Sequence, residues 1–197
     1  MSKSDTPRKR RAARTRQAIL DAARDMISEQ GIHNVSLRAI ARRVDYSPAG
    51  LYEYFGSKEE IVAAVVEDGF VRFARYLNSV PQELAPLDYL KQLGIAYLHF
   101  ADQNPQHFML IFNTLGLYQN RSDFISHSTF HTLTTALQRG IDSGDIRTER
   151  PLLELAYAGW SLVHGMATLR LTHLASDTTD WQTASEQVLE MWYAGLK

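Results

Sequence analysis

Apolar residues recur at helical spacing along this 197-residue chain, and no stretch beyond residue 81 alternates as a strand would. The spacing predicts a first helix over about 12–30, a long helix over about 58–79, and further helices over about 86–103, 105–114, 121–143, 150–175 and 180–195. The breaks between them fall at turn-forming pairs such as Asn104-Pro105 and Ser143-Gly144. The chain is therefore predicted to be all-α.

The stretch Ser36–Lys58 predicts two short helices and the start of a third. Ser36 can accept a hydrogen bond from the free N–H groups of the first helix, and Ser47-Pro48 starts the second with a capping residue followed by proline. The run Ser57–Glu60 has the pattern of a capping box. A helix, a tight turn and a second short helix make a helix-turn-helix, whose second helix enters the major groove of DNA.

At these residues the chain resembles the TetR family of bacterial transcriptional regulators, over roughly residues 15–66. The family pattern is matched in order by Ser47, Leu51, Tyr52, Tyr54, Phe55, Ser57 and Lys58. Two positions depart from it. Asp45 stands where the family most often has glycine in the turn, and aspartate tolerates a left-handed backbone better than most residues. Tyr54 stands where histidine is frequent, and both side chains can donate a hydrogen bond to a phosphate.

Charge is distributed unevenly, although the net charge is only −1. Residues 1–58 hold 12 Lys and Arg against 6 Asp and Glu, whereas the remainder holds 9 against 16. This asymmetry favours a basic portion that faces nucleic acid and an acidic body. The basic arm, Ser36, Tyr54 and Lys58 are expected to hold phosphates, and the second helix with Tyr52 to meet base edges or thymine methyl groups. The DNA-binding candidates are Lys9, Arg10, Arg11, Arg14, Ser36, Arg38, Ser47, Pro48, Ala49, Gly50, Tyr52, Tyr54 and Lys58.

We predict three parts: a DNA-binding domain over 1–57 with a basic N-terminal arm, a connecting helix over 58–80, and a ligand-binding and dimerisation domain over 81–197. The helix over 151–174 is apolar on nearly every side, so it must be buried on several sides. A chain of this size supplies a single core, so a second chain is expected to cover the remaining side. With the last helix it is expected to form a two-fold four-helix interface, which the resemblance also implies. The interface candidates are Leu162, Met166, Leu169, Trp181, Val188, Met191 and Trp192.

Aromatic and histidine side chains on the body helices suit a small-molecule cavity, although most such residues in proteins belong to the core. The candidates are Tyr97, His99, Phe100, Phe108, Phe112, Tyr118, Phe124, His127, His131, Trp160 and His164. The run Trp160–Gly165 resembles the Trp…His-Gly signature of one TetR C-terminal subclass. His127 and His131 have metal-ligand spacing, but no glutamate stands in the metalloprotease position and no cysteine is present, so no metal is predicted.

Several function classes lack their sequence signals. There is no cysteine, which suits a reducing cytoplasm, no apolar run near the roughly 20 residues of a spanning helix, and no apolar segment behind the basic N-terminus. We expect a cytoplasmic bacterial protein that does not enter a membrane. No phosphate-binding glycine loop and no Gly-x-Ser-x-Gly elbow is present, so neither catalysis nor a cofactor is predicted.

The sequence thus predicts a homodimeric repressor that binds a near-palindromic operator in double-stranded DNA and is released by a small apolar or aromatic effector. One alternative is a helical small-molecule carrier or enzyme that keeps a vestigial helix-turn-helix; the basic arm and the intact caps argue against it. A further alternative that the sequence leaves open is an activator, or a regulator without a ligand.

Overall fold

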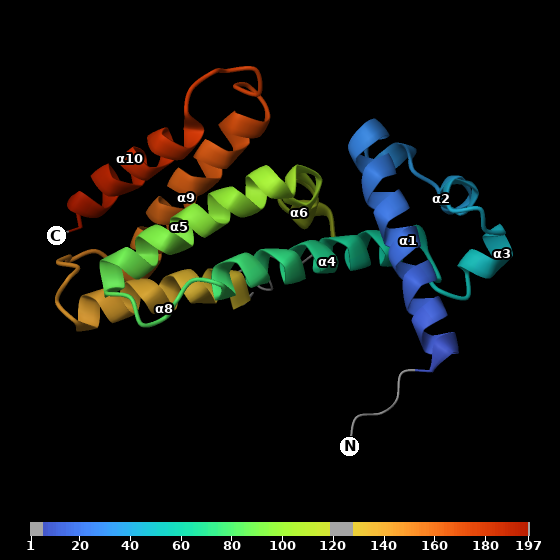
Figure 1. The fold of residues 1–197 in the computed structure, drawn as a ribbon, viewed down its shortest axis with the longest axis horizontal. Coiled ribbons are helices and arrows are strands. Elements are labelled where there is room, and N and C mark those ends of the chain that lie inside the picture. Colours follow the sequence, from blue (N-terminus) through green and yellow to red (C-terminus); the bar gives the residue numbers. More distant parts are fainter. Residues whose placement is uncertain (1–5, 119–127, 197) are drawn as a thin grey trace. The chain divides into compact units, whose positions relative to one another are not determined.

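The computed structural model describes residues 6–118 and 128–196, and within them every regular element is a helix (Figure 1). The prediction of an all-α protein is confirmed. The chain forms two compact units: one comprises residues 1–69 and 109–118, and the other comprises residues 70–108 and 119–197. We call the first, which holds the helix-turn-helix predicted to bind DNA, the DNA-reading unit, and we call the second the body. None of the described helices has both the length and the apolar character needed to cross a bilayer.

The DNA-reading unit begins with α1 (Pro7–Gln30), which starts earlier than the predicted residue 12. Proline at the first helical position and Thr6 as N-cap explain the earlier start: the Thr6 Oγ1 accepts from the Lys9 N–H at 3.4 Å. The basic run 8–11 is therefore the first turn of a helix, whereas the sequence predicted an arm that leads into one. Gly31, at φ 81°, ends the helix and leads into a short 3₁₀ turn, η1 (Ile32–Asn34).

The predicted helix-turn-helix is present as α2 (Leu37–Arg43) and α3 (Pro48–Leu51). The Ser36 Oγ accepts from the Ala39 N–H at 3.2 Å, and the Ser47 Oγ from the Gly50 N–H at 3.0 Å. Between the two helices Asp45 has φ 58°, the left-handed conformation expected of this turn position. The short helices are anchored by buried apolar side chains: Val35, Ile40, Ala41, Leu51 and Phe55.

The long helix α4 (Lys58–Asn78) starts at the predicted capping box. The Ser57 Oγ accepts from the Glu60 N–H at 3.1 Å, while the Glu60 carboxylate accepts from the Gly56 N–H at 2.7 Å. The helix begins in the DNA-reading unit and ends in the body. α6 (Pro105–Tyr118) crosses in the other direction, because residues 109–118 group with the DNA-reading unit. The sequence placed these residues in the C-terminal domain.

The body is built around α5 (Pro86–Gln103), which packs against α8 (Ser128–Asp142), α9 (Leu152–Leu171) and α10 (Trp181–Ala194). Gly94 lets α10 approach closely, since a Cβ there would lie 3.0 Å from the Leu189 side chain. The buried Tyr193 hydroxyl donates to the Leu90 carbonyl at 2.7 Å, which ties α10 to α5. These bounds lie within a few residues of those predicted, except that residues 121–127 of the helix predicted over 121–143 lie outside the described residues.

Candidate DNA interface and ligand site

α3 exposes the side chains that the sequence assigned to base contacts. Ser47, Pro48 and Ala49 are exposed, and the Tyr52 side chain after the helix is 57% exposed, whereas Leu51 is completely buried. The helix is therefore fixed by one apolar anchor and one cap, and its outer side carries no charge that a phosphate would repel. Glu53 follows this surface and is also exposed.

Gly50 permits a close aromatic contact within this surface. A Cβ at Gly50 would lie 3.0 Å from the ring of Tyr46, so the ring covers the backbone of α3. Tyr46 meets the half-buried Tyr54 edge to face, with the ring centroids 6.1 Å apart, and a hydrogen bond between the two hydroxyls raises the pKa of Tyr46. Sequence reasoning did not single out Tyr46. The signal that could have found it is an aromatic residue beside the turn.

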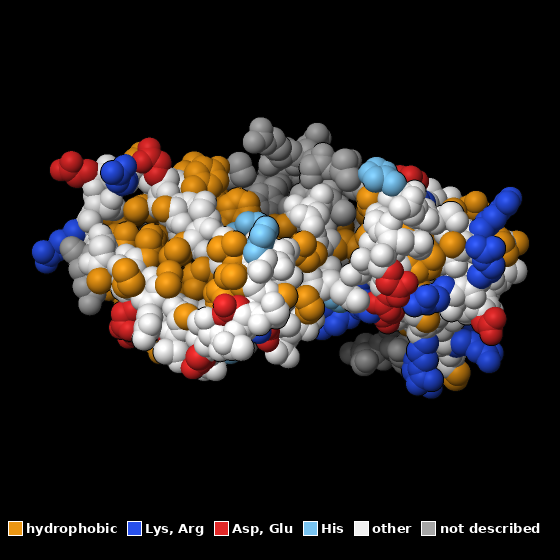
Figure 2. Space-filling model, turned by 90° about the horizontal axis from the view of Figure 1, so that it is seen from above, with side chains coloured by type: hydrophobic (Ala, Val, Ile, Leu, Met, Phe, Trp, Pro, Cys, Tyr) orange, Lys and Arg blue, Asp and Glu red, His pale blue; other side chains and the backbone are white. Residues whose placement is uncertain are grey.

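The cations of the DNA-reading unit include two that form ion pairs. Arg24 pairs with Asp21 and Asp25 at 3.0 and 2.8 Å, and the exposed Arg43 pairs with Glu29 at 3.0 Å. The other arginines of this unit include exposed ones on α1 and α2. Among the candidates, Lys9, Arg10, Arg11, Arg14 and Arg38 are exposed, and Lys58 is half-buried at the start of α4. Lys and Arg side chains of the DNA-reading unit are blue in Figure 2.

Four of the candidate pocket residues meet in the body. Tyr97 comes from α5, Phe108 from α6, and Trp160 and His164 from α9. The ring centroids of His164 lie 5.4 Å from Phe108 and 5.8 Å from Trp160. Two residues that the sequence did not single out extend this aromatic cluster, since Phe130 lies 6.1 Å from Trp160 and 5.9 Å from Tyr157.

A short polar chain runs through the aromatic cluster. The Tyr97 hydroxyl lies 2.8 Å from the His164 Nδ1, and the Trp160 indole is its other hydrogen-bond partner. Because an indole N–H only donates, the Tyr97 oxygen accepts from Trp160, and the same hydroxyl shares a hydrogen bond with the His164 Nδ1. Burial raises the pKa of Tyr97 far above its usual range and lowers the pKa of His164, so the cluster holds both groups neutral.

The remaining pocket candidates lie elsewhere. Phe100 is fully buried and stacks on Phe73 with centroids 4.9 Å apart, so it belongs to the core. Phe112 belongs to the DNA-reading unit, His99 lines a separate cavity, and His131 is exposed on α8. The side chains of Tyr118, Phe124 and His127 lie outside the described residues. Within the described part of the chain, no three His, Cys, Asp or Glu residues gather as metal ligands would.

α9 and α10 carry an exposed apolar surface in the body, and hydrophobic side chains gather there in Figure 2. Leu169 is 47% exposed and Met191 76%, while Leu162 and Val188 are half-buried. Ser161 and Gly165 add small residues to the α9 side, and a Cβ at Gly165 would meet no atom within 4 Å. We call the surface formed by these six residues the apolar face: Ser161, Leu162, Gly165, Leu169, Val188 and Met191.

Three of the seven predicted interface residues also have contacts within the chain. Met166 and Trp181 line a cavity within the body. Trp192 packs inward, because its ring lies 2.8 Å from where a Cβ on Gly159 would stand and 4.9 Å, between centroids, from Tyr193. In the sequence, a large apolar side chain at helical spacing looks the same whether it packs on a neighbouring helix or on a second chain.

Comparison with known proteins covers both units. Residues 19–65 match the family described as "Bacterial regulatory proteins, tetR family", and residues 90–192 match the "Tetracyclin repressor-like, C-terminal domain". The transcriptional regulator UidR of Escherichia coli K12 is 29% identical over 161 residues, covering 73% of this chain and 78% of UidR. The chain also shares its fold with the TetR family regulator PfmR of Thermus thermophilus (TM-score 0.74, 21% identity, 91% of this chain and 98% of PfmR). The fatty acid degradation regulator FadR of Bacillus halodurans is similar in fold too (TM-score 0.75, 18% identity, 96% of each chain).

Proposed function

The chain belongs to the TetR family and is a DNA-binding transcriptional regulator, and from this premise we propose that it is a homodimeric repressor released from its operator by a small molecule. The observation that carries the proposal is the pairing of a capped, uncharged recognition helix with an exposed apolar face on the body. The first feature needs a duplex as its partner. The second needs a copy of the chain, so that two recognition helices act together. We propose no catalytic activity for it.

At the DNA, the Ser36 cap is proposed to have two roles. Its hydroxyl accepts from its own helix and keeps its proton, which it can donate to a phosphate. Tyr54 and Lys58 would hold neighbouring phosphates, and the cations of the first turns of α1 would follow the backbone of the duplex. This leaves Ser47, Pro48, Ala49 and Tyr52 for the base edges and thymine methyl groups of the major groove.

Dimerisation is proposed through the apolar face. α9 offers Leu162 and Leu169 together with the small residues Ser161 and Gly165, which let a partner helix approach closely, and α10 adds Val188 and Met191. Two helices from each copy would form a four-helix bundle around a two-fold axis. A two-fold dimer presents its recognition helices to half-sites one helical turn apart, roughly 34–36 Å, and so requires a near-palindromic operator.

The effector is proposed to bind at the aromatic cluster. Aromatic walls with one buried polar chain suit an apolar or aromatic molecule that carries a single polar group. Phe108 of this cluster lies on α6, and α6 continues into the DNA-reading unit, as α4 does from the opposite direction. A ligand that prefers one position of these helices would favour a dimer whose recognition helices no longer fit successive grooves. A ligand without such a preference would release nothing.

The test is selection of genomic DNA fragments by the purified full-length chain, followed by fluorescence anisotropy on the recovered duplex. We expect a two-fold symmetric site bound with a Kd of roughly 10⁻⁸–10⁻¹¹ M at physiological salt. The same complex is then titrated with a panel of small aromatic and aliphatic compounds. At least one should release the DNA from the wild type and fail to release it from a Tyr97→Phe variant with normal operator affinity.

Two results would contradict this function. A chain that sediments as a monomer at micromolar concentration has no use for the apolar face. A chain that retains no duplex at low salt, where phosphate contacts are strongest, is not a DNA-binding regulator of this kind.

A further inference from the structure

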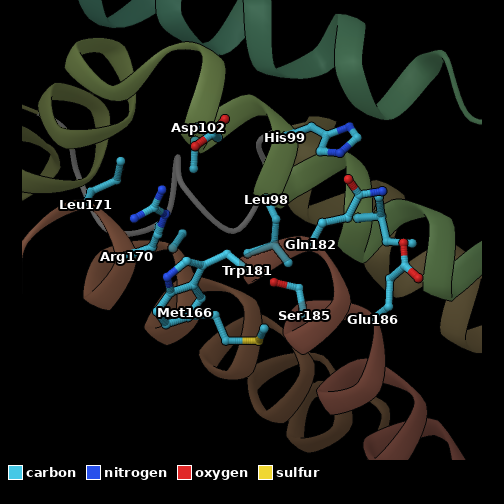
Figure 3. A pocket seen from close by; sticks show the side chains of 13 residues that line it. Leu98, His99, Asp102, Met166, Arg170, Leu171, Trp181, Gln182, Ser185 and Glu186 are labelled. Carbon is cyan, nitrogen blue, oxygen red and sulfur yellow. The ribbon is translucent and has the colours of Figure 1, made fainter. Parts of the chain in front are cut away.

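A cavity of about 250 Å³ lies inside the body, apart from the aromatic cluster, where α5, α9 and α10 meet (Figure 3). Its volume is about eight times the roughly 30 Å³ that one molecule occupies in liquid water. Ile95, Leu98, Met166, Ala167 and Leu171 make its apolar wall. The space therefore suits a small organic molecule, somewhat below the size of a typical drug.

One polar group in the cavity has no partner. The Trp181 Nε1 is buried from solvent, and no described residue accepts a hydrogen bond from it. An indole nitrogen can only donate, and leaving a buried donor unpaired is costly. Figure 3 shows this nitrogen on the edge of the ring nearest Arg170. The cavity thus offers a donor at the end formed by the last turn of α9 and the first turn of α10.

Arg170 adds positive charge at the same end. Its guanidinium lies 5.8 Å from the centroid of the Trp181 ring, and one of its nitrogens donates to the Leu174 carbonyl at 3.3 Å. Two lining carboxylates balance this charge: Asp102 is exposed on α5, and Glu186 lies more than one turn along α10 from Trp181. A head group that accepts a hydrogen bond therefore fits beside Trp181, while a cationic head would meet Arg170.

We propose that this cavity is a second small-molecule site, which takes a short apolar or aromatic compound with an acyl head, a carboxylate or carboxamide. The acyl oxygen accepts from the Trp181 Nε1, and the apolar body lies along Met166, Ala167 and Leu98. The site shares no lining residue with the aromatic cluster described above. It can therefore be occupied whether or not the aromatic cluster binds an effector.

The test uses three probes with one skeleton: 3-phenylpropionate, 3-phenylpropionamide and 3-phenylpropylamine. The full-length protein is labelled with ¹⁵N, and its three indole N–H resonances are followed by NMR, with Trp181 assigned from its loss in Trp181→Phe. We expect both acyl probes to move the Trp181 resonance downfield with saturation, and the amine to leave it in place. The ratio of the two affinities decides between the charged and the neutral head.

Variants locate the binding by calorimetry. Trp181→Phe keeps an aromatic wall but removes the donor, and it should weaken the acyl probes by about tenfold or more. Ala167→Leu fills the floor of the cavity, where Ala167 is 3% exposed, and should abolish binding while circular dichroism stays unchanged. Trp192→Phe makes the same exchange on the same helix outside the cavity and should bind like the wild type.

The outcomes separate this site from the proposed function. If the Trp181 resonance stays fixed with every probe, no probe reaches the indole nitrogen and the second site is wrong, even when DNA binding and release behave as proposed. Equal binding of the amine and the acyl probes would overturn the assignment of the head group. Binding that survives Ala167→Leu would place the probe outside this cavity and would also overturn the proposal.

Discussion

In the DNA-reading unit the side-chain hydrogen bonds that start the short helices join residues three apart, whereas in the body two buried tyrosine hydroxyls find partners far away along the chain. The Ser47 Oγ holds the Gly50 N–H three residues away. Tyr97 instead meets His164, 67 residues further along the chain, and Tyr193 reaches back to Leu90. The comparison teaches that the first unit is specified by short-range chemistry, while the second depends on how whole helices pack.

The largest expected effect comes from breaking the apolar face. Met191→Glu places a charge on the most exposed large apolar side chain of α10, where no packing within the chain is lost. Without the second copy, operator binding loses the effective concentration that links two half-sites, which is commonly worth about 10²–10⁴ in affinity. Sedimentation should show a monomer, and anisotropy should show the loss on the operator.

The control is Gln92→Glu, which adds the same charge to an exposed position on α5. It should remain dimeric and bind normally. Trp192→Glu is a poorer probe, because Trp192 packs on Gly159 and its loss would disturb the body itself. If Met191→Glu still sediments as a dimer, the copies meet through another surface.

Tyr52→Ala should have the next largest effect, and only on the specific site. Tyr52 is 57% exposed after a helix that depends on Leu51 for its anchor, so its removal leaves the DNA-reading unit folded. If Tyr52 reads a base, the loss is roughly 1–3 kcal/mol on the operator, with little change on random DNA. Anisotropy on both duplexes measures the difference, and equal losses would move Tyr52 to the phosphate contacts.

Lys58→Gln should change the salt dependence more than the specificity. Lys58 lies at the first position of α4, directly after the capped turn. Removing one phosphate contact per chain should reduce the slope of log K against log salt by about 0.9 for each site engaged. Lys91→Gln, at a lysine of the body that faces Glu190 at 3.5 Å, is the matched control. An unchanged slope for Lys58→Gln would exclude the phosphate contact.

The same contrast explains how far the sequence could be read. The caps at Ser36, Ser47 and Ser57 are local patterns that the sequence predicts. In the structure each serine hydroxyl accepts a hydrogen bond from the backbone N–H three residues further on. The start of α1 was missed because the basic run read as an arm, although Thr6 and Pro7 carry a start signal. Helical periodicity places residues on a face but does not say which neighbour covers that face.

Two tryptophans of the last helix illustrate this limit. Trp181 and Trp192 share one predicted stripe, yet one lines a cavity with an unpaired indole nitrogen and the other packs against a glycine of α9. Which of these occurs depends on the position of α9, and that position follows from contacts between segments far apart in the chain. Tyr97, His164 and Phe100 are all pocket candidates because they are aromatic or polar residues on body helices. Only the packing of those helices shows that Tyr97 and His164 meet each other while Phe100 belongs to the core.

The smallest expected effect tests the buried polar chain of the aromatic cluster. Burial lowers the pKa of His164, so the folded chain binds its proton less readily than the unfolded chain does. In the pH range between that lowered pKa and the ordinary value near 6.5, the unfolded state holds more protons, and stability must rise with pH. His164 therefore costs stability as the pH falls below about 6.5, and the cost stops growing below its folded pKa.

Urea unfolding at pH 7.5 and pH 5 should show a smaller loss for His164→Asn than for the wild type, while His173→Asn, at an exposed position, should follow the wild type. If all three chains lose the same stability, the imidazole is not held neutral by the cluster.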